Sequence, residues 1–201
     1  METLLDLSDD ERSPVREGAG FWLRALARVI DTLLHFAIGM AAGMTAGILV
    51  AIGSAIQGVS ADATFAKLSE NTPVTFIASV IGSMAMHVLA EGLHGSTVGK
   101  RICGLTVISE DGTPATLLGA LKRDIAYFFD ALFFGVVAAR KMAESPRRQR
   151  FGDVWGNTQV VRLSSLDAGA RRSWVRFVLA NAAGIAVDGV ALFTGLVSNL
   201  L

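Results

Sequence analysis

The sequence has few of the residues that build disulfides and none of the common catalytic patterns. Cys103 is the only cysteine among 201 residues, so no disulfide can form within the chain. It lies in a basic segment, which we place in the reducing cytoplasm. We find neither a hydrolase triad nor a redox motif, and the acidic N-terminal region is unlike a cleaved signal peptide. We therefore expect no enzyme and no cofactor.

Lysine and arginine are absent from three long apolar stretches, residues 29–52, 73–93 and 177–201. Each is long enough for a transmembrane helix, which needs roughly 20 residues. Apolar residues make up 52% of the chain, and a soluble domain has about 45–50%. Because the excess is concentrated in these stretches, the sequence predicts an integral membrane protein.

Basic residues are distributed unevenly between the segments that join the apolar stretches. Of the 18 Lys and Arg residues, only Lys67 lies between the first two stretches. Four precede the first stretch, four lie between Gly95 and Arg123, and nine lie between Arg140 and Arg176. Cytoplasmic loops of membrane proteins are enriched in these residues, so we expect the N-terminus and all three basic blocks in the cytoplasm.

Residues 115–143 predict a fourth helix, whose apolar run from 125 to 139 is about 22 Å long at 1.5 Å per residue. This is less than the hydrocarbon thickness of about 30 Å, and a crossing here would separate two basic blocks. We therefore predict an all-α membrane protein with three transmembrane helices plus one in-plane or re-entrant helix. Four transmembrane helices are the alternative. β-branched residues at 105–109 and 158–163 predict a short two-stranded β element on the cytoplasmic side.

Glycines recur every fourth residue in the first stretch, at Gly39, Gly43 and Gly47. This spacing places them on one helix face, where another backbone can approach closely. The face therefore predicts either helix packing within the chain or a homo-oligomer.

Titratable residues inside the apolar stretches are the main functional signal, because a charge in lipid costs several kcal/mol unless it is paired or hydrated. Asp31 and His35 lie one turn apart in the first stretch. Glu91 and His87 have the same spacing in the second, which runs in the opposite direction. If the two faces meet, these four residues form a candidate ion or proton site. Asp188, near the middle of the third stretch, also needs a partner or water.

Two alternatives compete with this site. In the first, Asp31 and Glu91 are interfacial acids held by basic residues, and the histidines are merely packed. The basic candidates are Arg24, Arg28 and Lys100. In the second, a metal binds to one helix face through His87, Glu91 and His94, although no second ligand motif supports it and we predict no metal.

The basic segments also suggest anion binding. Gly95 to Arg101 lacks the spacing of a phosphate loop, so we expect a turn that leaves the membrane, with Lys100 and Arg101 at lipid phosphates. The block from Pro146 to Arg150 adjoins a membrane helix, so we expect it to contact anionic lipid headgroups rather than nucleic acid.

Several short motifs, in order, resemble the RDD family of bacterial membrane proteins. The matching residues are Gly20-Phe21-Trp22-Leu23-Arg24, Ala27, Ile30-Asp31, Gly95-Ser96-Thr97-Val98-Gly99-Lys100, Gly104-Leu105-Thr106-Val107, Asp111-Gly112, Leu121-Lys122-Arg123, Gln149-Arg150-Phe151-Gly152-Asp153 and Thr158-Gln159-Val160-Val161. The resemblance divides the chain into an acidic cytoplasmic tail (1–19), an RDD-like membrane domain (20–162), and a basic linker with an additional C-terminal transmembrane helix (163–201).

The resemblance implies a bacterial inner-membrane protein. Some family members are thought to be cation/proton antiporters, and others accessory subunits, so we expect cation or proton-coupled transport or, alternatively, a scaffold for an unidentified membrane protein. The motif residues with an expected structural or functional role are Arg24, Asp31, Thr97, Gly99, Lys100, Arg123, Gln149, Arg150 and Asp153. We further expect ion pairs between Asp153 or Asp124 and a nearby Arg.

Overall fold

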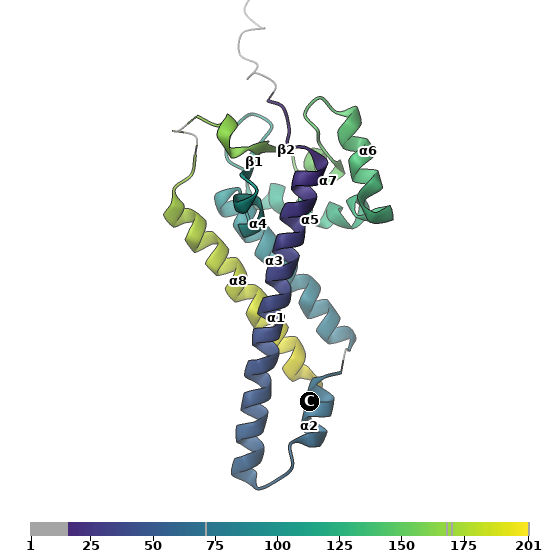
Figure 1. Cartoon of the computed structure of the whole chain (residues 1–201), viewed down its shortest axis with the longest axis vertical. Helices are drawn as coiled ribbons and strands as arrows, with labels where there is room; N and C mark the ends of the chain where they lie inside the picture. The colour runs from purple at the N-terminus through teal and green to yellow at the C-terminus, as the bar shows by residue number, and fades with distance from the viewer. Residues whose placement is uncertain (1–15, 71, 168, 170, 201) are drawn as a thin grey trace, which may run out of the picture.

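Long helices form a stalk, with a head of short elements at one end, around the start of the first helix (Figure 1). The computed structural model describes residues 16–70, 72–167, 169 and 171–200, so residues 1–15 of the predicted acidic tail lie outside the described residues. We call residues 95–167 the head. The elements are α1 (Phe21–Gln57), α2 (Asp62–Leu68), α3 (Pro73–His94), α4 (Val98–Ile102), β1 (Leu105–Ser109), α5 (Leu117–Asp130), η1 (Leu132–Gly135), α6 (Val136–Glu144), α7 (Phe151–Trp155), β2 (Thr158–Arg162), η2 (Leu163–Ser165), α8 (Trp174–Val197) and η4 (Ser198–Leu200).

Three helices are long and apolar enough to cross a membrane, and they coincide with the three predicted stretches. They are α1, α3, and α8 with its continuation η4. The Thr72 side chain caps α3 and Pro73 occupies its first turn, where the missing amide hydrogen costs nothing. The helix ends at Gly95, whose φ of 93° suits a residue without a side chain. The Gly95 cap therefore turns the chain out of α3.

Helix α1 is much longer than a single crossing requires. Its 37 residues extend about 56 Å, against a hydrocarbon core of about 30 Å. Its first turns, which carry Arg24 and Arg28, consequently project into the head.

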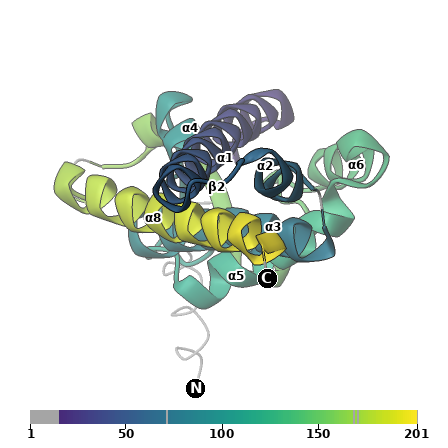
Figure 2. The same cartoon turned by 90° about the horizontal axis from the view of Figure 1, so that it is seen from below.

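Small residues allow the three long helices to approach one another. Gly184 of α8 lies against the backbone of Met86, and Gly195 lies against Ala78. Viewed from below, α8 runs beside α3 and crosses α1 (Figure 2). The predicted glycine face of α1 also packs within the chain, against the side chains of Leu192, Leu196 and Phe65.

The predicted helix over 115–143 is not one helix, which corrects that prediction. It is divided into α5, the 3-10 helix η1, and α6. The break contains Phe133 and Gly135 with φ of 51° and 84°, left-handed values that end an α-helix. Neither α5 nor α6 has the length of a membrane span.

The predicted two-stranded element is confirmed. β1 and β2 are antiparallel, with Leu105 opposite Arg162 and Ser109 opposite Thr158. β2 ends one residue earlier than predicted, because Leu163 begins η2. The Ala19 amide donates to the Val160 carbonyl at 2.8 Å, so the segment before α1 is tied to the sheet.

Candidate functional site

A polar cluster lies inside the bundle, where α1, α3 and α8 meet. His35 Nδ1 lies 2.8 Å from Asp188 Oδ2, and His35 Nε2 lies 3.0 Å from Ser79 Oγ. We call these three residues the membrane triad. All three lie about four turns from the head end of their helices. They therefore share one depth. The sequence predicted only that Asp188 needs a partner or water, and the structure supplies His35 as that partner.

Local sequence explains how an acid fits there. The missing side chain of Gly82 leaves the space that Asp188 occupies, because a Cβ at this position would meet the carboxylate and the Asp188 backbone. Asp188 is fully buried, and its Oδ1 has no hydrogen-bond partner among the described residues. One carboxylate oxygen thus lies beside the imidazole, and the other lies against Gly82 with no donor among the described residues.

Asp31 belongs to a second group, nearer the head. Its carboxylate accepts hydrogen bonds from the Thr97 hydroxyl at 2.6 Å and the Gly99 amide at 2.7 Å. His87 Nε2 lies 3.8 Å from the same carboxylate, while its Nδ1 lies 2.8 Å from the Ser83 carbonyl. Because a carbonyl only accepts, Nδ1 carries the hydrogen of this contact, and Nε2 faces the Asp31 carboxylate.

The remaining buried charges form an ion-pair network between the long helices and the head. Glu91 pairs with Lys100 and, at 3.3 Å, with Arg123 Nε. Arg123 Nη1 also pairs with Asp153 at 3.2 Å, and Asp153 accepts a 2.5 Å hydrogen bond from Arg24. The predicted pairing of Asp153 with arginines is therefore confirmed, and it joins α1, α3, α5 and α7 into one layer.

Two further pairs surround this core. Arg150 Nε lies 3.3 Å from Asp130, whose carboxylate also accepts from the amides of Phe151 and Gly152. Arg28 lies 3.5 Å from Asp124. We use the name ion-pair network for both pairs and the core: Arg24, Arg28, Glu91, Lys100, Arg123, Asp124, Asp130, Arg150 and Asp153.

Burial and charge act in opposite directions on the acids of the head. Burial alone would raise the pKa of Asp153, but Arg24, Arg123 and Arg150 hold that pKa well below its usual value. Burial raises the pKa of Asp124 and of Asp130, because it outweighs the nearby cations and, at Asp130, also the hydrogen bonds from two backbone amides. Asp153 is thus the acid whose charged form the network stabilises.

The predicted grouping of four titratable residues in the first two stretches divides in two. Asp31 lies opposite His87, and Glu91 lies one turn further along α3, nearer the head. His35 consequently faces Ser79 and Asp188. Sequence spacing placed each residue on its helix face, but it gave neither the register nor the position of α8.

The alternative metal-binding face does not assemble. His94 lies against the Phe177 ring, whereas Glu91 faces the cations Lys100 and Arg123. No group of three His, Cys, Asp or Glu side chains that could hold a metal occurs in the described part of the chain.

Two polar contributors were not predicted from the sequence. Ser79 completes the membrane triad, and Asn181 of α8 donates to the Ser96 carbonyl at 3.1 Å. Small polar residues inside an apolar helix are a signal for such contacts. Of the other motif residues, Gln149 donates to the Thr158 carbonyl at 2.8 Å and fixes the start of β2.

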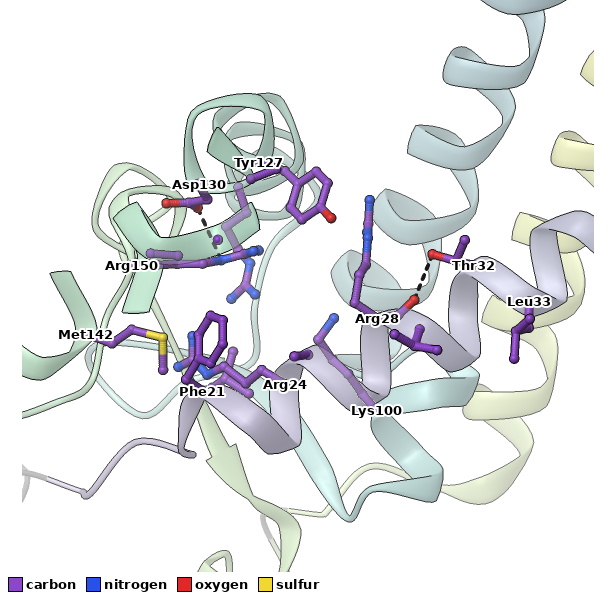
Figure 3. Close-up of a pocket in the computed structure, with 17 residues that line it drawn as sticks. Phe21, Arg24, Arg28, Thr32, Leu33, Lys100, Tyr127, Asp130, Met142 and Arg150 are labelled. Atoms are coloured by element: carbon purple, nitrogen blue, oxygen red, sulfur yellow. Dashed lines mark hydrogen bonds and ion pairs between the residues drawn. The ribbon is translucent and has the colours of Figure 1, made fainter. Parts of the chain in front are cut away.

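A cavity of about 500 Å³ lies beside the network, between α1, α5 and α6. Figure 3 shows Arg28 beside Tyr127, and the guanidinium lies 4.1 Å from the ring centre. Arg24, Lys100 and Arg150 also line this space. The cavity is therefore mainly cationic on its polar side.

The chain is similar to one known family. The model of the RDD family matches residues 18–157, more than half of the chain. This range includes the motif residues from Gly20 to Asp153 and ends just before Thr158-Gln159-Val160-Val161. Neither a curated protein nor a solved structure gives a significant match.

Proposed function

The chain belongs to the RDD family of membrane proteins, and from this premise we propose that it exchanges protons for a small monovalent cation at the membrane triad. The observation that supports this function is the His35–Asp188 pair, which places a buried carboxylate and an imidazole 2.8 Å apart near the middle of the bundle. Imidazole titrates near neutral pH, and a charge in lipid is costly unless it is compensated.

The charge balance of the pair favours exchange. With one shared proton, the pair is neutral overall, as carboxylate with imidazolium or as carboxylic acid with imidazole. Loss of that proton leaves one negative charge in a region of low dielectric. A monovalent cation that binds the carboxylate restores neutrality, and the carboxylate oxygens of Asp188 are the kind of ligand that hard cations prefer. Proton and cation therefore compete for one site.

We place the protein in the bacterial inner membrane, with three spans and with the N-terminus and head in the cytoplasm. Lys67 lies in α2, at the end of the stalk away from the head, whereas the described residues of the basic blocks lie in or beside the head (Figure 1). This distribution fits the positive-inside bias. The exposed side chains of Phe128, Phe129 and Leu132 fit an α5–α6 segment that lies in the membrane interface.

Vesicle flux tests the transport proposal. Purified protein is reconstituted with a pH-sensitive dye inside, and a Na⁺, K⁺ or Li⁺ gradient is applied. We expect cation-driven proton movement that falls at least about tenfold in Asp188→Asn and in His35→Gln. Asp62→Asn makes the same chemical change on an exposed acid at the far end of the stalk and should retain the flux. Equal flux in Asp188→Asn and the parent chain would overturn the proposal.

A scaffold role is the second candidate, because the acids of the ion-pair network all face basic side chains, as a rigid docking layer requires. Purification from native membranes separates the two candidates. A stoichiometric membrane partner, together with absent flux, favours the scaffold. A self-contained protein or homo-oligomer whose stability depends on cations favours transport.

A further inference from the structure

The cavity beside the ion-pair network is lined by more basic side chains than acidic ones. Five basic side chains line it: Arg24, Arg28, Lys100, Arg123 and Arg150. Asp130 is the one acid among the lining residues. Asp153 and Glu91 are buried behind the basic layer and do not line the space. The lining therefore carries more positive than negative side chains.

Several donors of these side chains have no acceptor in the described part of the chain. Arg123 is only 1% exposed, and its buried Nη2 has no hydrogen-bond partner. Nε of Arg24 is also without a partner. These two atoms have almost no accessible surface, so they do not face the cavity. The Arg28 and Arg150 side chains, 26% and 20% exposed, are the ones that an anion in the cavity can reach.

The opposite side of the cavity is apolar and opens toward lipid. Val29 and Leu33 of α1 line it and are more than half exposed, on a helix that we place in the membrane. Met142 of α6 adds a further apolar wall, and the labelled side chains in Figure 3 lie around one space, with the cations between Met142 and Leu33. A ligand that fits both sides has an anionic group joined to a hydrocarbon chain.

We propose that this cavity binds the phosphate of an anionic phospholipid, with an acyl chain lying along Val29 and Leu33. Arginine forks match phosphate oxygens in pairs, and basic pockets between helices at the cytoplasmic side are suited to such headgroups. Arg28 is the best-placed residue to respond to the ligand. Its side chain is about one quarter exposed, and its one acidic partner, Asp124, is 3.5 Å away. This site is independent of the membrane triad and does not require transport.

Lipid retention and thermal stability test the proposal on the full chain in detergent. Phosphatidylglycerol is added to one sample, phosphatidylcholine to a second, and glycerol phosphate, which has no acyl chains, to a third. We expect only phosphatidylglycerol to raise the unfolding temperature and to remain bound in native mass spectrometry. Equal effects of the two lipids overturn the proposal, and an equal effect of glycerol phosphate overturns the lipid as source.

Variants locate the effect at the cavity. Arg28→Gln should weaken the apparent affinity for phosphatidylglycerol about tenfold or more, because a hydrogen bond to a charged group is lost. Arg28→Lys keeps the charge and should lose less. Arg140→Gln removes a guanidinium that is 84% exposed and outside the cavity, and it should bind like the parent chain. An unchanged affinity in Arg28→Gln would contradict the assignment, and if that variant does not fold, Arg28→Lys decides.

Discussion

Replacement of Asp153 by Asn should be among the most damaging single changes in the head. The carboxylate is fully buried and lies within 2.5–3.8 Å of Arg24, Arg123 and Arg150. Asn has nearly the same size but no charge, so the three guanidinium groups would lose their shared counter-ion without loss of packing volume. Removal of one partner of a buried ion pair costs roughly 3–5 kcal/mol. We expect a loss of this size in the free energy of unfolding.

Unfolding in detergent, followed by tryptophan fluorescence, measures this loss. Asp167→Asn is the matched control, because Asp167 is 91% exposed and its distance to Arg16 is 4.0 Å. A surface pair contributes little, so the control should change stability by less than about 1 kcal/mol. A loss in Asp153→Asn no larger than that of the control would refute a structural role for the network. Normal stability with lost flux would instead assign Asp153 to transport.

Three further outcomes follow from the structure. Gly99→Ala should lower stability by about 1–3 kcal/mol, because the added methyl group would meet Asp31 and the Ala27 carbonyl; wild-type stability in this variant would contradict the close packing of α4 on α1. Gly82→Leu should remove both folded protein and flux, because its side chain needs the space of Asp188, and detergent size exclusion checks this. Below about pH 4, the free energy of unfolding should fall in the parent chain but less in Asp153→Asn. The pKa of Asp153 is lower in the folded than in the unfolded chain, so this residue stabilises the fold above its unfolded-state pKa and loses that effect on acidification. Parallel pH curves for the two proteins would contradict this.

Much of the fold was predictable because its signals are local in sequence. Apolar length gave the three long helices, and β-branched residues gave β1 and β2. The break between α5 and α6 was missed because it depends on left-handed backbone at Phe133, a residue that does not usually adopt it. A pattern of hydrophobic residues contains no information about that conformation.

The candidate site was less predictable because it depends on contacts between distant segments. The depth of Asp188 correctly indicated a need for a partner, but only the crossing of α8 over α1 identifies His35. Likewise, the acidic and basic motif residues predicted ion pairs. Helix packing determines that Asp153 pairs with Arg24 and Arg123. Register between helices is a tertiary property, and one sequence does not specify it by spacing alone.

Proton release on cation binding tests the exchange site most directly. Purified protein in a weakly buffered detergent solution near pH 7 is titrated with Na⁺, K⁺ or Li⁺, and the protons released per protein are counted with an indicator dye. We expect about one proton released per cation bound in the parent chain, and none in Asp188→Asn, which cannot exchange a proton at that position. Cation binding without proton release, or equal release from Asp188→Asn, would contradict exchange at His35 and Asp188.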